Sequence, residues 1–378
     1  MTCIILSKGR VGLRRDRRAE CEGSQVIDIA IIGAGPAGAH CAASLTKEGF
    51  QSVLFDHSHP REKPCGGGLS PFAQDKFPFL KDLPILHEEE NCVRIVYLDN
   101  RGIDIALKRS FIMTSRQRLD RYLLDTAISH GAQLKREKVI HIEKCREGWK
   151  VKTNKGLYRA RILIGADGVH STVRKITIGS FQPLDLALSF GYLAKPLKGQ
   201  HIVFRFLPEK KGYIWIFPRG DDICVGVGAE MRRSSNLKTE LDRFLKVHCP
   251  RLQPKSQWAA LIPTLRSHTL QKRTAGTNWI LIGDAAGHVD QITGEGIPYA
   301  LRSAELASEA ISQNNLHLYD SSWREEYGAF LSYSAKLRNL IFSRCICTPY
   351  FAFSLLMSGK LLTQSPIRIT EKRTERLR

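Results

Sequence analysis

Three glycines at a fixed spacing, Gly33, Gly35 and Gly38, constrain the fold of this chain more than any other feature of its sequence. They lie between an apolar segment at 26–32, typical of a buried strand, and a segment at 36–50 whose apolar residues recur at helical spacing. In such a unit the first glycine makes a tight turn, the second lets backbone amides approach a pyrophosphate, and the third lets the helix pack on the strand. The pattern predicts a dinucleotide site at the helix N-terminus.

A second apolar segment, QSVLFD, extends this unit to β-α-β and predicts the start of a parallel sheet. It ends at Asp56, 18 residues after Gly38, close to the roughly 20 residues expected for an acid that binds a ribose. Ala37 lies in the first helical turn, beside the expected phosphates. The alternative, a glycine turn that binds no ligand, does not account for the acid at this distance.

Two distant segments repeat the combination of apolar strand, glycine turn and aspartate. They are LIGADGVHSTVR at 163–174 and LIGDAAG at 281–287. Both resemble the second and third signatures of the FAD-binding flavoprotein family that includes the aromatic hydroxylases and the geranylgeranyl reductases. The resemblance implies FAD as the cofactor, with Gly283 and Asp284 at the ribityl hydroxyls. It places Asp167 near the pyrophosphate, and a helix cap is the alternative role for this residue.

The same resemblance implies two further contacts with FAD. Arg116, in SRQRLDRYL, is expected near the pyrophosphate. Gly294, Gly296 and Ile297 belong to GEGIP, which begins a helix just after the Asp284 turn. The positive end of that helix would lie at the pyrimidine edge of the flavin and favour the negative charge of the reduced form.

Two more motifs narrow the resemblance to the geranylgeranyl reductases. KPCGGGLSP at 63–71 is similar to their cysteine–glycine loop, and YIWIFPRGDDICVGVG at 213–228 is similar to their Y-x-W-x-F-P…G-x-G segment. Arg219 stands where a lysine is usual, and the spacing to Gly226 is slightly short. The resemblance covers most of 26–312 and is thin beyond it.

Cys65, Tyr213 and Trp215 are the candidate catalytic residues. Cys65 is expected to face substrate and flavin, although a small buried residue in a glycine turn is the alternative. Tyr213 and Trp215 alternate along a strand and therefore share one face, which is either sheet core or the wall of an apolar cavity. His170 and His288 lie beside flavin motifs and are candidates for proton transfer, or are structural.

The resemblance implies reduction of carbon–carbon double bonds in an isoprenoid chain. An isoprenoid lipid or isoprenoid diphosphate would be the substrate, with NADPH or ferredoxin as the electron donor. One alternative is a flavin-dependent monooxygenase or halogenase, because YIWIFP is loosely similar to a halogenase motif, although CGGG argues against it. Another is a non-catalytic flavoprotein, which would bind FAD but lack a long apolar tunnel.

Charge and cysteine content limit partners and metals. The formal charge of +20 favours anionic partners. Basic residues crowd both ends without interleaved aromatic residues or a nucleic-acid motif, which favours a membrane surface over nucleic acid. The apolar stretch 350–362 contains Lys360 and is shorter than the roughly 20 residues that span a bilayer. Ten cysteines without C-x-x-C or zinc spacing predict a cytoplasmic protein without a metal site. The charge, the basic ends and the apolar stretch together favour peripheral contact with a membrane surface.

These patterns predict an α/β protein with a Rossmann-like FAD-binding domain, an inserted β-rich substrate domain and a C-terminal helical segment. The helix at SRQRLDRYLLDTAISHGAQ is expected to bury Leu119, Leu123, Ala127 and Ile128 on one face. The expected boundaries are 1–25 for a basic extension, 26–182 and 273–315 for the two parts of the FAD-binding domain, 183–272 for the substrate domain, joined by strands at 92–110, and 316–378 for the helical segment.

Overall fold

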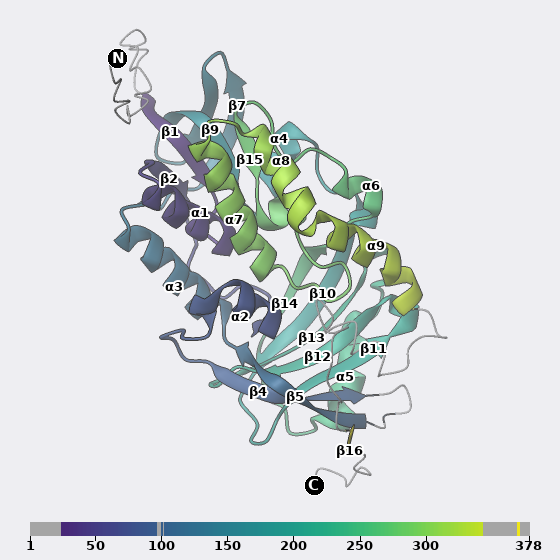
Figure 1. Cartoon of the computed structure of the whole chain (residues 1–378). Helices are drawn as coiled ribbons and strands as arrows, with labels where there is room; N and C mark the ends of the chain where they lie inside the picture. The colour runs from purple at the N-terminus through teal and green to yellow at the C-terminus, as the bar shows by residue number, and fades with distance from the viewer. Residues whose placement is uncertain (1–23, 97–99, 101, 343–368, 371–378) are drawn as a thin grey trace, which may run out of the picture.

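Two β-sheets lie at opposite ends of the molecule, and most helices pack on the first of them (Figure 1). The computed structural model describes residues 24–96, 100, 102–342 and 369–370. The chain combines two sheets with helices that pack on them, so the α/β class expected from the sequence is confirmed. The basic N-terminus and the apolar stretch 350–362 lie outside the described residues.

The first sheet has the strand order β6-β2-β1-β9-β8-β7, and β15 pairs with β9. Its parallel strands are β1 (Ser24–Ile32), β2 (Ser52–Phe55), β6 (Gln133–Lys135), β9 (Leu157–Gly165) and β15 (Trp279–Leu281), and its antiparallel strands are β7 (Val139–Cys145) and β8 (Gly148–Thr153). Ser24 already pairs with Leu157, so β1 starts two residues before the expected boundary at 26. The carboxyl ends of β1 and β9 therefore lie side by side, next to the glycine turn.

Helices α1 (Pro36–Lys47), α3 (Arg116–Ser129), α7 (Ile297–Ser312) and α8 (His317–Trp323) share one core with this sheet. Figure 1 shows α1 between α3 and α7. The prediction that α3 buries Ile128 is wrong, because that side chain is 43% exposed. Ile128 lies in the last turn of α3, one residue before the helix ends at Ser129, and the buried face of the helix ends at Ala127.

The second sheet has the order β14-β10-β13-β12-β11-β4-β5-β16, and β3 pairs with β5. Its strands are β3 (Gly68–Leu69), β4 (Glu88–Val96), β5 (Gly102–Met113), β10 (Leu186–Ala194), β11 (Ile202–Leu207), β12 (Gly212–Pro218), β13 (Ile223–Glu230), β14 (Pro254–Pro263) and β16 (Ile369–Thr370). Helix α5 (Leu237–His248) packs on one face through Leu241 and Phe244. The opposite face carries the aromatic residues of β11 and β12.

The remaining helices and helical turns lie between these strands and helices along the chain. They are α2 (Pro71–Lys76), α4 (Thr172–Thr177), α6 (Ser267–Leu270), α9 (Ala329–Ile341), the 3-10 turns η1 (Pro78–Leu80), η2 (Pro183–Asp185), η3 (Pro208–Lys210), η4 (Met231–Arg233) and η5 (Gly283–Ala285), and the π-turn η6 (Arg324–Gly328). The run from α8 to α9 leads from the first sheet to the second (Figure 1), where Phe342 joins the second sheet's core. We propose that the first sheet belongs to the expected FAD-binding domain and the second sheet to the expected substrate domain. None of the described helices is both long and apolar enough to cross a membrane.

Candidate active site

The glycine turn after β1 is closed on one side and open on the other. Gly33 has φ +101°, and a Cβ there would lie 2.4 Å from the carbonyl oxygen of Ala166. A Cβ on Gly38 would lie 1.8 Å from the carbonyl oxygen of Gly33, so α1 can approach the turn only without a side chain. At Gly35 the nearest atom to such a Cβ is the Nε2 of His59, at 3.6 Å. The open side is therefore the side on which a phosphate could approach the backbone.

Asp56, at the end of β2, anchors this turn. Its carboxylate accepts hydrogen bonds from the backbone N–H of Ala34 at 2.9 Å and of Ser58 at 2.8 Å. It also accepts one from the Nδ1 of His59 at 2.7 Å. Burial opposes ionisation, but the hydrogen bond and charge of His59 and the backbone donors outweigh it and lower the pKa of Asp56. Asp56 is therefore an ionised acceptor that fixes the turn, and its contact with a ribose stays a prediction.

Arg116 is the first residue of α3 and forms a buried bidentate pair with Asp120, through its Nε and Nη2 at 2.8 Å each. Burial opposes the positive charge, but the carboxylate of Asp120 outweighs it and raises the pKa of Arg116. The Oδ2 of Asp120 lies 3.5 Å from the Nε2 of His59. One chain of charged and polar groups, called the charged chain below, therefore lies beside the glycine turn. Its members are Arg116, Asp120, His59 and Asp56.

Asp167 follows β9 and supports the short helix α4. Its carboxylate accepts hydrogen bonds from the hydroxyl of Ser171 and, at 2.6 Å, from the backbone N–H of Thr172. Burial raises the pKa of Asp167 in spite of these donors. Asp167 therefore supports the N-terminus of α4, as the alternative role predicts, and its contact with the pyrophosphate remains a prediction.

The turn after β15 places Asp284 at the N-terminus of α7. The backbone N–H of Gly283 donates to the Oγ of Ser303 at 3.0 Å, which holds the turn against the helix. A Cβ on Gly296 would lie 3.3 Å from the Oδ1 of Asp284. The Oδ2 of Asp284 is 3.9 Å from the Nζ of Lys63, in the loop that contains Cys65. Lys63, about a third exposed, therefore brings the cysteine–glycine loop to the predicted ribityl site.

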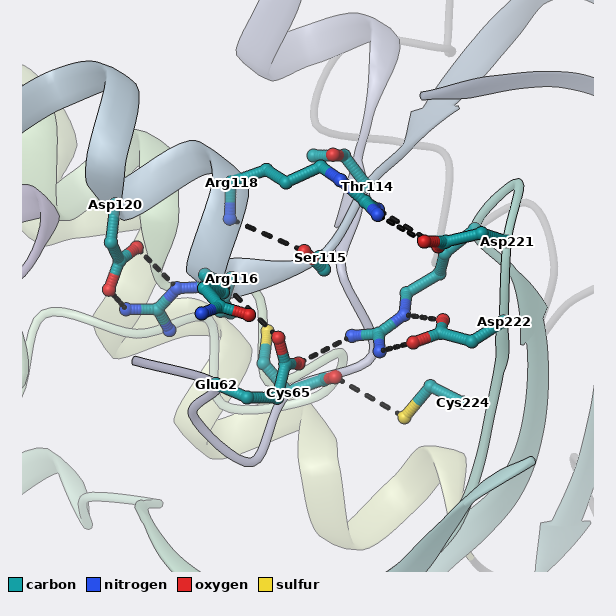
Figure 2. Close-up of polar contacts among 12 residues, drawn as sticks. Glu62, Cys65, Thr114, Ser115, Arg116, Arg118, Asp120, Asp221, Asp222 and Cys224 are labelled. Atoms are coloured by element: carbon teal, nitrogen blue, oxygen red, sulfur yellow. Dashed lines mark hydrogen bonds and ion pairs between the residues drawn. The ribbon is translucent and has the colours of Figure 1, made fainter. Parts of the chain in front are cut away.

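The cysteine–glycine loop packs directly on β12. A Cβ on Gly66 would lie 2.5 Å from the ring of Phe217, and one on Gly67 would lie 2.1 Å from the carbonyl oxygen of Thr114. The carbonyl oxygen of Cys65 accepts a hydrogen bond from the Sγ of Cys224 at 3.3 Å (Figure 2). Cys65 itself is half-buried. The structure thus brings together two motifs that are about 150 residues apart in the sequence.

The face of the second sheet beneath this loop combines tryptophans with glycines. In the strand register Gly191 pairs with both Trp258 and Gly226, and Gly226 pairs with Trp215. A Cβ on Gly226 would lie 2.3 Å from the Trp215 ring, and one on Gly191 would lie 2.4 Å from the Trp258 ring. Neither indole N–H has a hydrogen-bond partner among the residues described. The glycines therefore let two indole rings lie flat on the sheet.

Tyr213 joins this aromatic face to the loop before α7. Its hydroxyl donates to the carbonyl oxygen of Thr293, and a Cβ on Gly294 would lie 3.6 Å from the hydroxyl oxygen. Burial raises the pKa of Tyr213, so the phenol stays protonated. Ile297, the first residue of α7, is buried. Tyr213, Trp215 and Gly294 are therefore brought together at the junction of the two sheets.

Glu295 is a residue that the sequence patterns did not single out. Its Oε1 accepts a hydrogen bond from the backbone N–H of Ser70 at 3.4 Å, which connects the loop before α7 with the end of the cysteine–glycine loop. Burial raises the pKa of Glu295 to about 7, and the negative charge of Asp290 adds to the effect. A carboxyl group with this pKa holds a proton at neutral pH and can release it.

Glu62 and Arg219 form a second feature that the sequence did not reveal. Buried Arg219 binds Asp222 through its Nε and Nη2 at 2.7 Å each, and its Nη1 donates to Glu62 at 2.8 Å. Glu62 also accepts from the backbone N–H of Gln117 at 3.2 Å. Figure 2 shows Glu62 and Cys65 between Arg116 on one side and Asp222 on the other. The bidentate contact needs a guanidinium, which explains arginine in place of the usual lysine.

The two histidines beside the flavin motifs lie in different environments. His170 is exposed. His288 is fully buried, with its Nδ1 3.0 Å from the hydroxyl of Tyr327 and its ring packed on Trp323. Burial lowers the pKa of His288 to about 3. It therefore stays neutral at physiological pH and has a structural role, which disfavours it as a proton donor.

Comparison with known proteins gives the class of this molecule. The family model described as FAD dependent oxidoreductase matches residues 108–308, more than half of the chain, and that of the lycopene cyclase protein matches 28–184. An uncharacterised protein of Methanosarcina barkeri is 32% identical over 309 residues, 76% of this chain and 75% of that protein. The menaquinone reductase of Mycolicibacterium smegmatis is 29% identical, over 83% of this chain and 84% of its own.

Two further relatives carry geranylgeranyl names. The geranylgeranyl diphosphate reductase of Synechocystis is 27% identical over 80% of this chain and 82% of its own. A geranylgeranyl bacteriochlorophyll reductase-like structure from Thermoplasma acidophilum has a TM-score of 0.74 at 21% identity, over 85% of this chain and 88% of that one. The chain therefore belongs to the FAD-dependent oxidoreductases. FAD, the cofactor that the description of this family names, is its cofactor.

The residues of the glycine turn fit this cofactor. The first turn of α1 carries only uncharged side chains, so its backbone N–H groups face no competing carboxylate. The backbone at Gly35 is open to a phosphate, and the buried Nε2 of His59 faces the same point. Buried Arg116 adds a permanent positive charge nearby. These features match the needs of a pyrophosphate, an anion with many acceptor oxygens.

Proposed function

We propose that this protein reduces carbon–carbon double bonds in an isoprenoid chain, with electrons that reach FAD from NADPH or ferredoxin. The observation that supports this most is the close packing of the Cys65 loop on the tryptophan face of the second sheet. It offers an apolar surface next to the predicted flavin site. The names of the geranylgeranyl relatives support the same substrate class, an isoprenoid lipid or isoprenoid diphosphate.

The proposed cofactor placement follows the three glycine turns. Gly33, Gly35, Ala37 and Gly38 would hold the pyrophosphate at the N-terminus of α1, with Asp56 at the ribose and Arg116 and Asp167 near the phosphates. Gly283 and Asp284 would bind the ribityl chain, and Gly294, Gly296 and Ile297 would border the pyrimidine edge. When bound and reduced, FAD supplies a hydride. The N-terminus of α7 would stabilise negative charge at that edge.

The aromatic face would hold the substrate chain. An isolated alkene is a poor hydride acceptor, so the site must fix it at contact distance and exclude water. The ring centroids of buried Trp215 and half-buried Trp258 lie 6.0 Å apart, and the glycines beneath them let both rings lie close to the sheet. Tyr213 closes one end through its hydrogen bond to Thr293. We propose that this face orients the double bond beside the Cys65 loop.

Each reduced double bond also needs one proton. Since the Oε1 of Glu295 accepts from Ser70, we propose that the Oε2 of Glu295 carries this proton at neutral pH. The Cys65 thiol would contact the alkene or help to position the proton donor. Cys65 is half-buried in a loop whose glycines allow close approach to a planar ring. Glu295 belongs to the loop before α7 and Cys65 to the cysteine–glycine loop, and the hydrogen bond from Ser70 to Glu295 connects these two loops.

The test uses purified full-length protein with bound FAD, reduced by dithionite without oxygen. Geranylgeranyl diphosphate and a geranylgeranyl lipid are offered separately, and mass spectrometry follows the gain of two hydrogens per double bond. We expect saturation of at least one of them. A protein that binds FAD but saturates neither, and that in a separate assay in air without dithionite consumes oxygen in step with an oxygenated or halogenated product, would contradict the proposal and favour the monooxygenase alternative. FAD bound without turnover of any kind would favour the non-catalytic one.

We also propose that the protein attaches to membrane surfaces. The charge of +20 favours anionic headgroups, and the proposed substrate resides in a bilayer. Vesicle flotation with anionic lipid at low and high salt tests the attachment, which salt should weaken. Absence of binding at low salt would contradict it and favour a soluble substrate.

A further inference from the structure

Arg219 lies beneath the cysteine–glycine loop and contacts it on both sides of Cys65. Its side chain directly follows β12 and is fully buried. On one side of Cys65, its Nη1 donates to the Oε1 of Glu62 at 2.8 Å. On the other side, a Cβ on Gly67 would lie 2.9 Å from its Cδ. One buried side chain at the edge of the second sheet therefore supports the segment 62–67.

The charge of Arg219 is balanced without Glu62. Asp222, in the turn between β12 and β13, accepts from its Nε and Nη2 at 2.7 Å each, and the Asp222 carbonyl oxygen accepts from its backbone N–H at 2.9 Å. A buried cation needs a counter-ion, and this bidentate carboxylate supplies one. The side chain of Glu62 is 28% exposed, and its contact is additional. Loss of that contact should leave Arg219 paired and free the loop alone.

The loop has further contacts that orient Cys65. Glu62 accepts from the backbone N–H of Gln117, in the first turn of α3, at 3.2 Å. The carbonyl oxygen of Cys65 accepts from the Sγ of Cys224, on β13, at 3.3 Å. In Figure 2 the sulfur of Cys65 lies on the other side of the loop, towards Arg116. The second sheet thus holds the loop backbone, while the thiol faces the predicted cofactor site.

We propose that Glu62 and Arg219 are positioning residues, whose ion pair holds the cysteine–glycine loop so that the Cys65 thiol stays at the cofactor site. They act through the loop and not by contact with a substrate. The lysine that is usual at position 219 ends in a single nitrogen, so it cannot hold Asp222 in a bidentate contact and also bind Glu62 in this geometry. This chain therefore fixes its loop more firmly than a lysine would.

The test measures how fast iodoacetamide modifies Cys65 in the full-length protein with FAD bound, by mass spectrometry of the peptide that contains it. A half-buried thiol reacts faster when its loop opens more often. Glu62→Ala removes the contact, and Arg219→Lys weakens it without a change of charge, so a faster reaction there does not come from altered thiol ionisation. We expect roughly 2- to 10-fold faster modification in each, as for the loss of one hydrogen bond, with FAD content retained.

A neighbouring ion pair supplies the matched control. Arg118, on α3, binds Asp221, which precedes Asp222 in the same turn, and both partners of this pair are more exposed than Arg219. Arg118→Gln breaks that pair and should leave the modification of Cys65 unchanged. An equal acceleration in Arg118→Gln would overturn the proposal, because any loosening of the turn would then suffice.

Two internal controls separate the loop from the fold. Arg219→Lys should add nothing in the Glu62→Ala background, since both changes act on one contact. Buried Cys224 should stay slow to react in every variant, because it becomes accessible only when the second sheet opens. Unchanged rates in both single variants, additive effects in the double variant, or a joint acceleration at Cys224 would each overturn the proposal.

A second measurement rests on the proposed function. With the geranylgeranyl substrate that the unchanged protein saturates, Glu62→Ala should lower kcat several-fold with little change in KM, because orientation at the Cys65 loop is lost and apolar binding is kept. An unchanged kcat beside a faster reaction of Cys65 would overturn the positioning role. If no variant and not even the unchanged protein reduces an alkene, the proposed function fails, and the iodoacetamide rates still decide whether this ion pair holds the loop.

Discussion

The two ends of the candidate site are organised by different forces. Around the glycine turn, charge-assisted hydrogen bonds join Arg116 to Asp120, and join Asp56 to His59 and to the backbone of the turn. On the second sheet, the indole N–H groups of Trp215 and Trp258 are buried without partners among the described residues, and the rings are placed by adjoining glycines. The comparison indicates that the cofactor end is preorganised by charge and the substrate end by shape.

The sharpest way to break this comparison is to remove one member of the charged chain. Arg116→Met leaves the Asp120 carboxylate buried and without its bidentate partner. We expect a loss of about 3–5 kcal/mol in the free energy of unfolding, because an uncompensated buried charge is costly. Urea denaturation of the FAD-free and FAD-loaded protein measures it, and FAD content should fall as well.

A matched double variant tests whether the charge is the cause. Arg116→Met with Asp120→Leu removes both charges and should regain most of the stability but not the FAD affinity. If Arg116→Met alone unfolds as the unchanged protein does, the cofactor end is not held by charge, and the comparison fails.

The next effect concerns the ribityl site. Asp284→Ala should weaken FAD binding by about 5- to 100-fold, as expected for the loss of one or two hydrogen bonds to a charged acceptor. Lys272→Ala, a change of an exposed residue, is the control and should leave FAD content unaltered. Flavin absorbance per mole of purified protein measures both. Equal FAD content in the two variants would remove Asp284 from the cofactor site.

The difference between the two ends also explains what the sequence could predict. The glycine turn and Asp56 are recognisable because backbone conformation and close approach restrict those positions to one or two residue types. Residues fixed by distant partners leave no such local sign. Arg219 meets Glu62 across 157 positions, and His59 becomes informative only when its ring is seen against Asp56 and Gly35. The motifs at 63–71 and 213–228 were identified, but their contact required the fold.

A smaller effect is expected at Cys65. Cys65→Ala should keep FAD content and the melting temperature near those of the unchanged protein, because the loop is held by its glycines and by the carbonyl oxygen of Cys65, which remain. Alkene reduction should fall, or the number of double bonds reduced should change, while flavin reduction by dithionite persists. A structural role for the thiol predicts instead a joint loss of FAD and thermal stability. Unchanged products would exclude a catalytic role.

The last prediction uses pH to separate Glu295 from Cys65. The pKa of Glu295 is raised to about 7, so its protonated form is favoured in the fold. The resulting stability is fully present below the unfolded pKa near 4.5 and is lost as pH rises through about 7. Relative to Glu295→Gln, which does not titrate, the unchanged protein should therefore lose melting temperature between about pH 4.5 and 7 and change little above pH 7.5.

Activity should follow the same ionisation. If the Oε2 of Glu295 supplies the proton, alkene reduction by the unchanged protein falls about tenfold per unit above pH 7, where the group has lost its proton. Glu295→Gln should be slow and independent of pH in this range, with FAD content retained, whereas Cys65→Ala should keep the decline near pH 7. A Glu295→Gln variant that retains both the rate and its pH dependence would assign the proton to another group, while leaving the tryptophan face as the substrate surface.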